Sequence, residues 1–435
     1  MEEILFYIFV LLFLLLIIFF LNRKNKKIGR ANSIDPITIF TGGLFAYSCI
    51  GSYDRIGLYE NDISTPFIFY CSVLLGYVFF AAGYLNNLNK DQKAFVENKI
   101  AFSIFPLSIQ RKDKESIAIL AFFLTVVIIN ISTLVDMILN FGVGVAYTEV
   151  ALRDSRTALS GPRALLDSFF ALVMIGFPAY NMLKSGKISL GDALILFLYM
   201  VYSVVCGYRT NLVSIGLVLC VYLNFRIKRL KIRYLLVGAI LALFFMILLG
   251  HLRAESSIWD MVDMFKSSDK DLFSVESSGE FSNTVETCYT YIENSAFNYG
   301  YSWILEILMY IPVFLWPGRP LPLPEQYVKT YFPSAPDGYG KGWFVLTDGY
   351  SAFGIVGVII EMYIIGMVLA KLYNYFMKRK DSYFLMMIYV FFLVNIFIMI
   401  RGSFLSFLKT FTLSIIPLIL IHHFWGKNRK KNTYL

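Results

Sequence analysis

The run ILFYIFVLLFLLLIIFFL fills residues 4–21, and four basic residues follow it within 23–27. An unbroken apolar run of this length is sufficient to cross the hydrocarbon core of a bilayer as one helix. Glu2 and Glu3 stand where a cleavable signal peptide carries basic residues. We therefore expect the run to remain as a transmembrane helix whose N-terminal end lies outside the cytoplasm.

Similar apolar runs recur along the whole chain of 435 residues, of which 57% are hydrophobic and 16% charged. A soluble domain is nearer half apolar and a quarter charged. This composition excludes a soluble enzyme, a disordered protein and a secreted disulfide scaffold. An outer-membrane barrel is excluded because its strands would alternate apolar and polar residues. The sequence predicts an all-α, polytopic bundle of transmembrane helices that forms one integral membrane domain over residues 1–435.

Apolar length predicts about eleven spans. They are expected at 4–21, 36–52, 67–85, 116–139, 164–183, 191–207, 210–225, 234–250, 354–372, 382–400 and 404–425. Most of the 39 Lys and Arg residues then fall in cytoplasmic loops, and most of the 30 acidic residues fall outside. This positive-inside bias predicts an external N-terminus and a cytoplasmic C-terminus.

One external loop, residues 251–353, holds about a quarter of the chain and is expected to carry function. It is acidic at first and then rich in proline, glycine and aromatic residues. Its apolar segment at 302–316 is short for a span and contains Glu306 and Pro312. We interpret this segment as a short interfacial or re-entrant helix.

Metal and cofactor chemistry is not expected. The chain has 3 His and 5 Cys residues, and none are spaced as a metal or redox motif. Its net charge of +9 reflects the basic cytoplasmic side of a membrane protein and does not predict nucleic-acid binding.

Three arginines, Arg209, Arg253 and Arg401, stand at predicted external span ends, where the charge bias disfavours basic residues. A guanidinium binds phosphate oxygens in a bidentate manner, so a cluster at headgroup depth suits a diphosphate. We add Arg319 and His251 to this candidate diphosphate site. The alternative is that these side chains snorkel to ordinary lipid phosphates or cap helix ends.

A second group of arginines lies in the loop after the fourth predicted span. Arg153, Arg156 and Arg163 are candidates for a second anionic headgroup. The alternative is a solvated helix face on which the arginines pair with Glu149 and Asp154.

External carboxylates are the candidates for acid or base catalysis. Glu280 lies among small residues, and Asp348 precedes the ninth predicted span. Either carboxylate is suited to deprotonating a sugar hydroxyl that attacks an activated anomeric carbon. Arg253 is expected to act with them on the leaving group. The alternative is that such acids only keep the loop soluble.

Aromatic residues of the same loop are candidates for sugar contacts, because their rings stack on the apolar faces of sugars. Tyr289, Tyr339 and Tyr350 are the ones we select, and Lys341 is expected to touch an anion.

Short motifs spread over most of the chain resemble those of the O-antigen polymerases (Wzy type) and related oligosaccharide repeat unit polymerases. Their order along the chain carries the resemblance. They are Asp35-Pro36, the Gly-Tyr-Arg-Thr turn at 207–210, Ser-Gly-Glu-Phe at 278–281, Tyr-Gly-Tyr-Ser at 299–302, the Pro-rich 311–320, and the Gly-rich segment before Tyr350. Asp348 stands where the family pattern leads us to expect Glu.

The resemblance implies a metal-independent glycosyltransferase of the membrane-embedded type C superfamily, in the bacterial inner membrane. Such an enzyme would take undecaprenyl-diphosphate-linked oligosaccharides at the periplasmic face. It would transfer the growing glycan from its lipid diphosphate to an incoming lipid-linked unit, with Glu280 as the base. The resemblance also implies a co-polymerase partner that sets chain length.

Three other functions stay open at this point. An O-antigen ligase shares the architecture but transfers glycan to lipid A-core. A lipid-linked oligosaccharide flippase would have short external loops, unlike 251–353. A small-solute transporter would keep ionisable groups at mid-membrane, where Glu361 is the only deep candidate.

Overall fold

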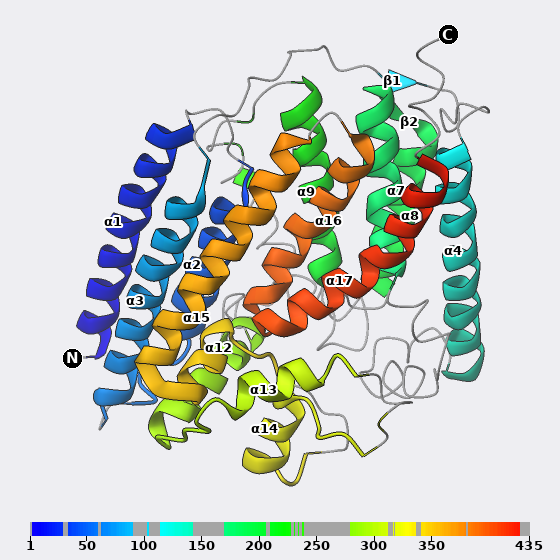
Figure 1. The fold of residues 1–435 in the computed structure, drawn as a ribbon. Helices are drawn as coiled ribbons and strands as arrows, with labels where there is room; N and C mark the ends of the chain where they lie inside the picture. Colours follow the sequence, from blue (N-terminus) through cyan, green and yellow to red (C-terminus); the bar gives the residue numbers. More distant parts are fainter. Residues whose placement is uncertain are drawn as a thin grey trace, which may run out of the picture. The chain divides into compact units, whose positions relative to one another are not determined.

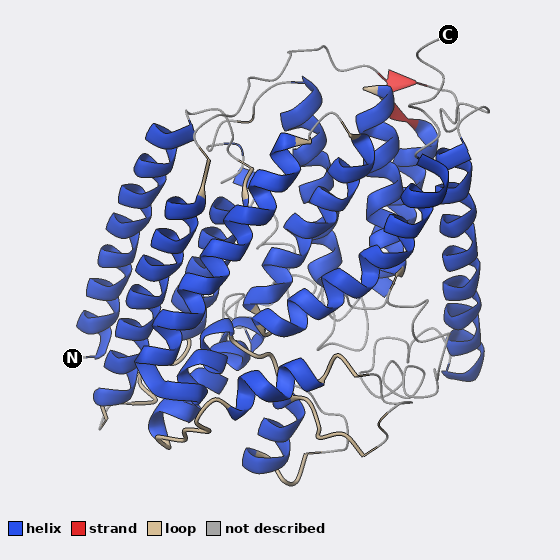
Figure 2. Ribbon diagram, viewed as in Figure 1, coloured by secondary structure: helices blue, strands red, loops and turns tan. Residues whose placement is uncertain are grey.

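A computed structural model gives the fold, which is almost entirely helical in the part of the chain that it describes (Figure 2). That part comprises residues 2–28, 34–59, 62–89, 102–103, 114–141, 169–205, 209–227, 230, 234, 237–238, 279–311, 316, 318–335, 341–379 and 382–426. The chain forms two compact units. Unit 1 comprises residues 1–93, 267–378 and 395–409, and unit 2 comprises 94–266, 379–394 and 410–435.

Five described helices are long and apolar enough to cross a membrane, which confirms the predicted multi-pass helical character. They are Glu2–Lys27, Ser64–Asn87, Val345–Lys378, Tyr383–Ile400 and Phe404–Phe424.

Unit 1 contains the N-terminal helices and most of the late loop. Its complete helices are α1 (Glu2–Ile28), α2 (Pro36–Tyr53), α3 (Ser64–Asn87), α12 (Gly279–Glu293), α13 (Tyr301–Leu308), α14 (Leu323–Tyr331) and α15 (Val345–Lys378) (Figure 1). It also takes in the end of α16 (Tyr383–Ile400) and the start of α17 (Phe404–Ile421).

A buried ion pair joins α1 to the start of α2. Asp35 caps α2 by accepting a hydrogen bond from the Thr38 N–H (2.9 Å), and Pro36 follows in the first turn. The other oxygen of Asp35 lies 2.6 Å from Lys24 Nζ, and both side chains are buried. This is the end of unit 1 that the charge pattern assigns to the cytoplasm.

The opposite end of unit 1, here called the outer end, holds the start of α1, the turn at 54–59 and α12 to α14 (Figure 1). The Glu2 carboxylate accepts a hydrogen bond from the Gly57 N–H at 2.9 Å, which ties α1 to that turn. Segments that the sequence assigns to the external side therefore meet at one end of this unit.

Helices α3 and α15 pack with their backbones in close approach. A Cβ on Gly366 would lie 2.1 Å from the Phe80 carbonyl oxygen, and one on Gly83 would lie 2.3 Å from that of Tyr363. Small residues allow this approach between helices in a membrane.

Helix α15 is interrupted at Phe353 and Gly354, where the backbone leaves helical geometry and Gly354 adopts a φ of 62°. A Cβ on Gly357 would lie 2.0 Å from the Gly349 carbonyl oxygen, so the segment before the break packs directly on the segment after it. The break coincides with the start predicted for the ninth span. The end of the late loop is therefore a short helical segment, 345–352.

The late loop also contains helices that its composition did not indicate, α12 and α14. The segment at 302–316, predicted as one helix, contains the shorter α13, which ends at Leu308. A proline disfavours helical geometry in the residue before it, and Pro312 follows this end closely.

The described part of unit 2 consists of helices and one two-stranded sheet. Its elements are β1 (Phe102–Ser103), α4 (Lys114–Phe141), α7 (Phe170–Ser185), β2 (Ile188–Ser189), α8 (Leu190–Val205), α9 (Arg209–Tyr222), η2 (Leu223–Ile227) and η3 (His422–Gly426), with parts of α16 and α17. The two strands pair in parallel, and Asn181 donates a hydrogen bond to the Asp192 carboxylate at 3.1 Å. The predicted span at 234–250 lies almost entirely outside the described residues.

Substituting a contact glycine of α3 or α15 is expected to destabilise unit 1. Gly366→Val or Gly83→Val adds atoms where a carbonyl oxygen already lies, and such overpacking costs about 1–3 kcal/mol. Thermal unfolding in detergent, followed by the loss of monodisperse protein, should show a midpoint lower by several degrees. Gly42→Val in α2 is the control, because no atom lies within 4 Å of a Cβ there. An equal midpoint for all variants would contradict the close approach.

Candidate functional site

The outer end of unit 1 is organised around α12. On one side, α12 packs closely on α2, since a Cβ on Gly51 would lie 2.7 Å from the Phe281 carbonyl oxygen. Further along α12, the Tyr289 hydroxyl donates a hydrogen bond to Ser52 Oγ at 3.2 Å. These contacts hold a polar helix firmly against an apolar one.

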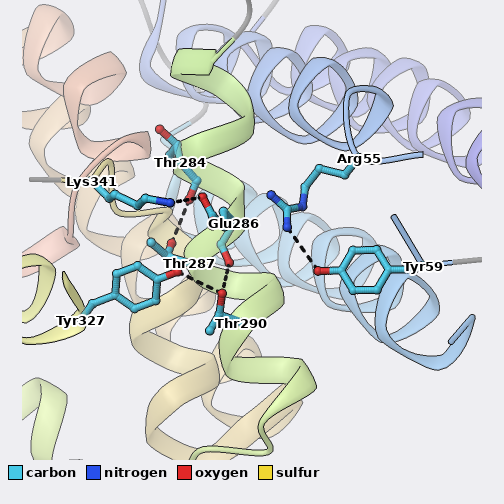
Figure 3. A network of polar contacts seen from close by, with 8 residues as sticks. All are labelled: Arg55, Tyr59, Thr284, Glu286, Thr287, Thr290, Tyr327 and Lys341. Carbon is cyan, nitrogen blue, oxygen red and sulfur yellow. Dashed lines mark hydrogen bonds and ion pairs between the residues drawn. The ribbon is translucent and has the colours of Figure 1, made fainter. Parts of the chain in front are cut away.

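The other side of α12 forms hydrogen bonds with the start of α15 and the residue before it. The Thr287 hydroxyl lies 3.1 Å from that of Thr347 and accepts a hydrogen bond from the Phe344 N–H at 3.3 Å. Thr290 lies 2.9 Å from the Tyr327 hydroxyl of α14 (Figure 3). The hydroxyls of α12 therefore fix the positions of α14 and α15.

Lys341 and Glu286 form an ion pair at 2.5 Å, and both side chains are largely buried. The Lys341 ammonium also lies 3.9 Å from the centre of the Phe332 ring. Lys341, predicted to touch an anion, is thus already paired with a carboxylate of α12.

Asp348 is buried, with 1% of its surface exposed. The Trp343 indole N–H donates a hydrogen bond to Asp348 Oδ1 at 2.6 Å, and the Trp343 backbone N–H donates to the Arg401 carbonyl at 3.1 Å. Asp348 and Arg401 therefore belong to adjoining segments. The Arg401 residue is exposed, whereas the Asp348 carboxylate is enclosed by protein.

Glu306 of α13 is a buried acid that sequence reasoning treated only as evidence against a span. Its carboxylate accepts hydrogen bonds from the Ser403 hydroxyl and the Leu405 N–H, and Lys409 lies close enough to act on it electrostatically. Burial raises the pKa of Glu306 to about 7, against an ordinary value of 4.5, although these three partners act in the opposite direction.

Arg319, assigned to the candidate diphosphate site, bonds to backbone carbonyls after α13. Its Nη1 donates to the Ile311 oxygen at 2.8 Å and to the Met309 oxygen at 3.3 Å. This arrangement caps the carbonyls left free at a helix end, which is one of the alternatives considered for these arginines.

Two of the tyrosines chosen for sugar contacts are buried. The Tyr289 ring stacks on those of Phe69 (4.3 Å between centroids) and Tyr59 (5.4 Å). Tyr350 is 5% exposed and lies against Phe297. Both rings pack within unit 1.

Other predicted site residues have side chains outside the described part. Glu280 is the second residue of α12 and Arg209 is the first residue of α9, and only their backbone is described. The remaining predicted residues lie wholly outside it. These are Arg253, His251, Arg153, Arg156, Arg163 and Tyr339.

Sequence reasoning missed Arg55 and Glu286, which both lie at the outer end. Arg55 comes directly after the predicted span 36–52, at an external span end, so the criterion that selected Arg209 and Arg401 applies to it equally. Glu286 carried no such signal, because its partner Lys341 is distant in sequence. Among the described residues, no group of three or more His, Cys, Asp or Glu side chains is arranged to hold a metal ion.

The pKa of Glu306 predicts a pH dependence of stability. A carboxyl whose folded-state pKa is raised favours the folded state at low pH, and this contribution is lost as the pH rises from about 4.5 through about 7. The thermal midpoint of the wild-type protein should therefore fall between about pH 5 and about pH 8, and Glu306→Gln should show a smaller fall. Glu325→Gln, on the exposed side of α14, is the control. Equal slopes for wild type and Glu306→Gln would mean that this carboxyl is ionised throughout.

Comparison with known proteins gives one match that spans nearly the whole chain. The family model of the O-antigen polysaccharide polymerase Wzy matches residues 2–431. No curated protein and no solved structure matches the chain. The length of the family match agrees with the multi-pass helical fold, and the chain belongs to the O-antigen polysaccharide polymerase Wzy family.

Proposed function

We propose that this protein polymerises undecaprenyl-diphosphate-linked oligosaccharide repeat units into O-antigen or a related surface polysaccharide. The observation that carries the proposal is the family match over residues 2–431. The reaction is placed at the periplasmic face of the bacterial inner membrane. The packed outer end of unit 1 supports this placement, because it gathers charged and hydroxyl side chains on segments that the sequence assigns to the external side.

The proposed step forms one bond and breaks one. A hydroxyl oxygen of the incoming lipid-linked unit attacks the anomeric carbon of the growing glycan, and the bond from that carbon to the lipid diphosphate breaks. Glu280 takes the hydroxyl proton, and the lipid diphosphate leaves with the electron pair. The donor is already activated, so we propose a metal-independent reaction that uses no cofactor.

Cations stabilise the negative charge that develops on the leaving diphosphate. Arg253 is proposed to act directly on it, together with Arg209, Arg401 and His251. Arg319 belongs to the same proposed group. It donates hydrogen bonds to the carbonyls after α13, and we propose that it acts by positioning that chain segment.

The remaining residues are assigned to the acceptor and the sugars. Arg153, Arg156 and Arg163 are proposed to hold the second lipid headgroup. Tyr339 is proposed as a direct sugar contact, and Lys341 as an anion contact.

Asp348 is the second candidate carboxylate. Asp348 is buried and hydrogen-bonded to Trp343, which supports a role in positioning the segment before the break in α15. Tyr289 and Tyr350, which are also buried, are proposed to support the sugar site by packing. A chain-length-determining co-polymerase is the proposed protein partner.

An in vitro polymerisation assay tests the proposal. Purified protein in lipid, given undecaprenyl-diphosphate-linked repeat units with EDTA and no nucleotide, should produce a ladder of products on a gel. Glu280→Gln should lower the rate about 10²–10⁴-fold through loss of the base. Arg253→Gln and Arg401→Gln should lower it about 10²–10³-fold through loss of charge stabilisation.

Glu325→Gln and Arg23→Gln are the matched controls, since each removes one exposed charge outside the proposed site. Both should keep the wild-type rate. Transfer that appears only when lipid A-core is supplied would identify a ligase instead. No transfer to either acceptor by folded protein would reject the glycosyltransferase function.

A further inference from the structure

Arg55, at the outer end of unit 1, is positively charged and has none of the roles proposed above. It belongs to the Arg55 cluster, which we define as Arg55, Tyr59, Glu286, Tyr289 and Lys341. Figure 3 shows the charged members around α12, with Arg55 on one side of the helix and Lys341 on the other.

Arg55 is held in place by aromatic rings. Its guanidinium carbon lies 5.3 Å from the centre of the Tyr289 ring and 5.8 Å from that of Tyr59. Its Nη2 donates a hydrogen bond to the Tyr59 hydroxyl at 3.3 Å. Cation–π contacts of this kind orient a guanidinium without neutralising it.

The positive charge of Arg55 is not compensated within the described part of the chain. No described carboxylate forms an ion pair with it, and its Nε is buried with no hydrogen-bond partner. Glu286 is engaged with Lys341 at 2.5 Å. A guanidinium has five N–H donors, and the hydrogen bond to Tyr59 engages one of those on Arg55, which is a partly exposed residue.

Hydroxyl groups that can form hydrogen bonds with a sugar are influenced by the charges of Arg55 and Glu286. Burial raises the pKa of the Tyr59 and Tyr327 hydroxyls, Glu286 adds to this rise and Arg55 opposes it, so both charges act on both tyrosines. Thr290 is bonded to Tyr327 at the edge of this group. A preoriented cation, a carboxylate and hydroxyls together match a saccharide that carries a negative charge.

We propose that the Arg55 cluster is a binding site for an oxyanion of the saccharide substrate, and that Arg55 is the residue that takes the oxyanion. The oxyanion is either the carboxylate of an acidic sugar or the phosphate that joins a sugar to its lipid. Arg55 is a binding and specificity residue, separate from the proposed catalytic group. The inference rests on the proposed function for the identity of the substrate, but the binding itself can be measured without turnover.

Binding of small probes to the full-length protein in phosphatidylcholine nanodiscs tests the proposal. Saturation-transfer NMR compares methyl β-D-glucuronide, glucose 1-phosphate and the neutral methyl β-D-glucoside. At least one charged probe should bind about tenfold more tightly than the glucoside, which corresponds to about 1.4 kcal/mol. Preference for the glucuronide identifies an acidic sugar as the source, and preference for the phosphate identifies the lipid linkage.

Arg55→Gln should abolish this preference and leave glucoside binding unchanged. Arg55→Lys should keep part of it, because lysine retains the charge but loses the planar fork. This variant also preserves the test if Arg55→Gln does not fold. Arg23→Gln is the matched control, since Arg23 also lies over an aromatic ring, that of Phe19, at 5.0 Å. Equal binding of all three probes, or an unchanged preference in folded Arg55→Gln or Arg55→Lys, would overturn the proposal.

The polymerisation ladder separates this inference from the function on which it rests. A ladder with the wild-type protein but no preference for a charged probe would reject the Arg55 site alone. An Arg55-dependent preference without any ladder would support the site and reject the polymerase.

Discussion

The backbones of α3 and α15 lie against each other at Gly83 and Gly366, where neither helix has space for a side chain. This contact fixes the position of α15 against α3. The break at Gly354 then directs the preceding segment across the outer end of unit 1, and that segment carries Thr347 and Asp348. The close approach thus positions one of the two surfaces against which α12 packs, and α2 supplies the other.

Helix α12 shows how a polar helix is held in an apolar protein. Its Thr287 bonds to the start of α15, its Tyr289 packs between aromatic rings and bonds to α2, and its Glu286 pairs with Lys341. Buried polar groups stabilise a fold only when they have partners. Arg55, beside α12, is less completely satisfied, because aromatic rings orient it but its buried Nε has no hydrogen-bond partner among the described residues.

The sequence alone predicts those helices whose evidence lies within a short stretch of residues, such as an apolar run. The apolar runs at 382–400 and 36–52 correspond to α16 and α2. The helices of the late loop were missed because α12 is polar and its stabilising partners are distant, as Thr287 and Thr347 are 60 residues apart. The same distance hid the Lys341–Glu286 pair. Arg55, in contrast, carried a readable signal that was not used.

The buried pair of Lys24 and Asp35 has a consequence for how the chain is made. The contact exists only once α1 and the start of α2 have packed together, so Lys24 contributes a full positive charge while the first helix is being oriented. Once the second segment arrives, the carboxylate neutralises that charge in the folded protein. In the orientation that the charge pattern predicts, Lys24 would therefore add to the positive-inside bias during insertion, and in the folded protein it is part of the interface between α1 and α2.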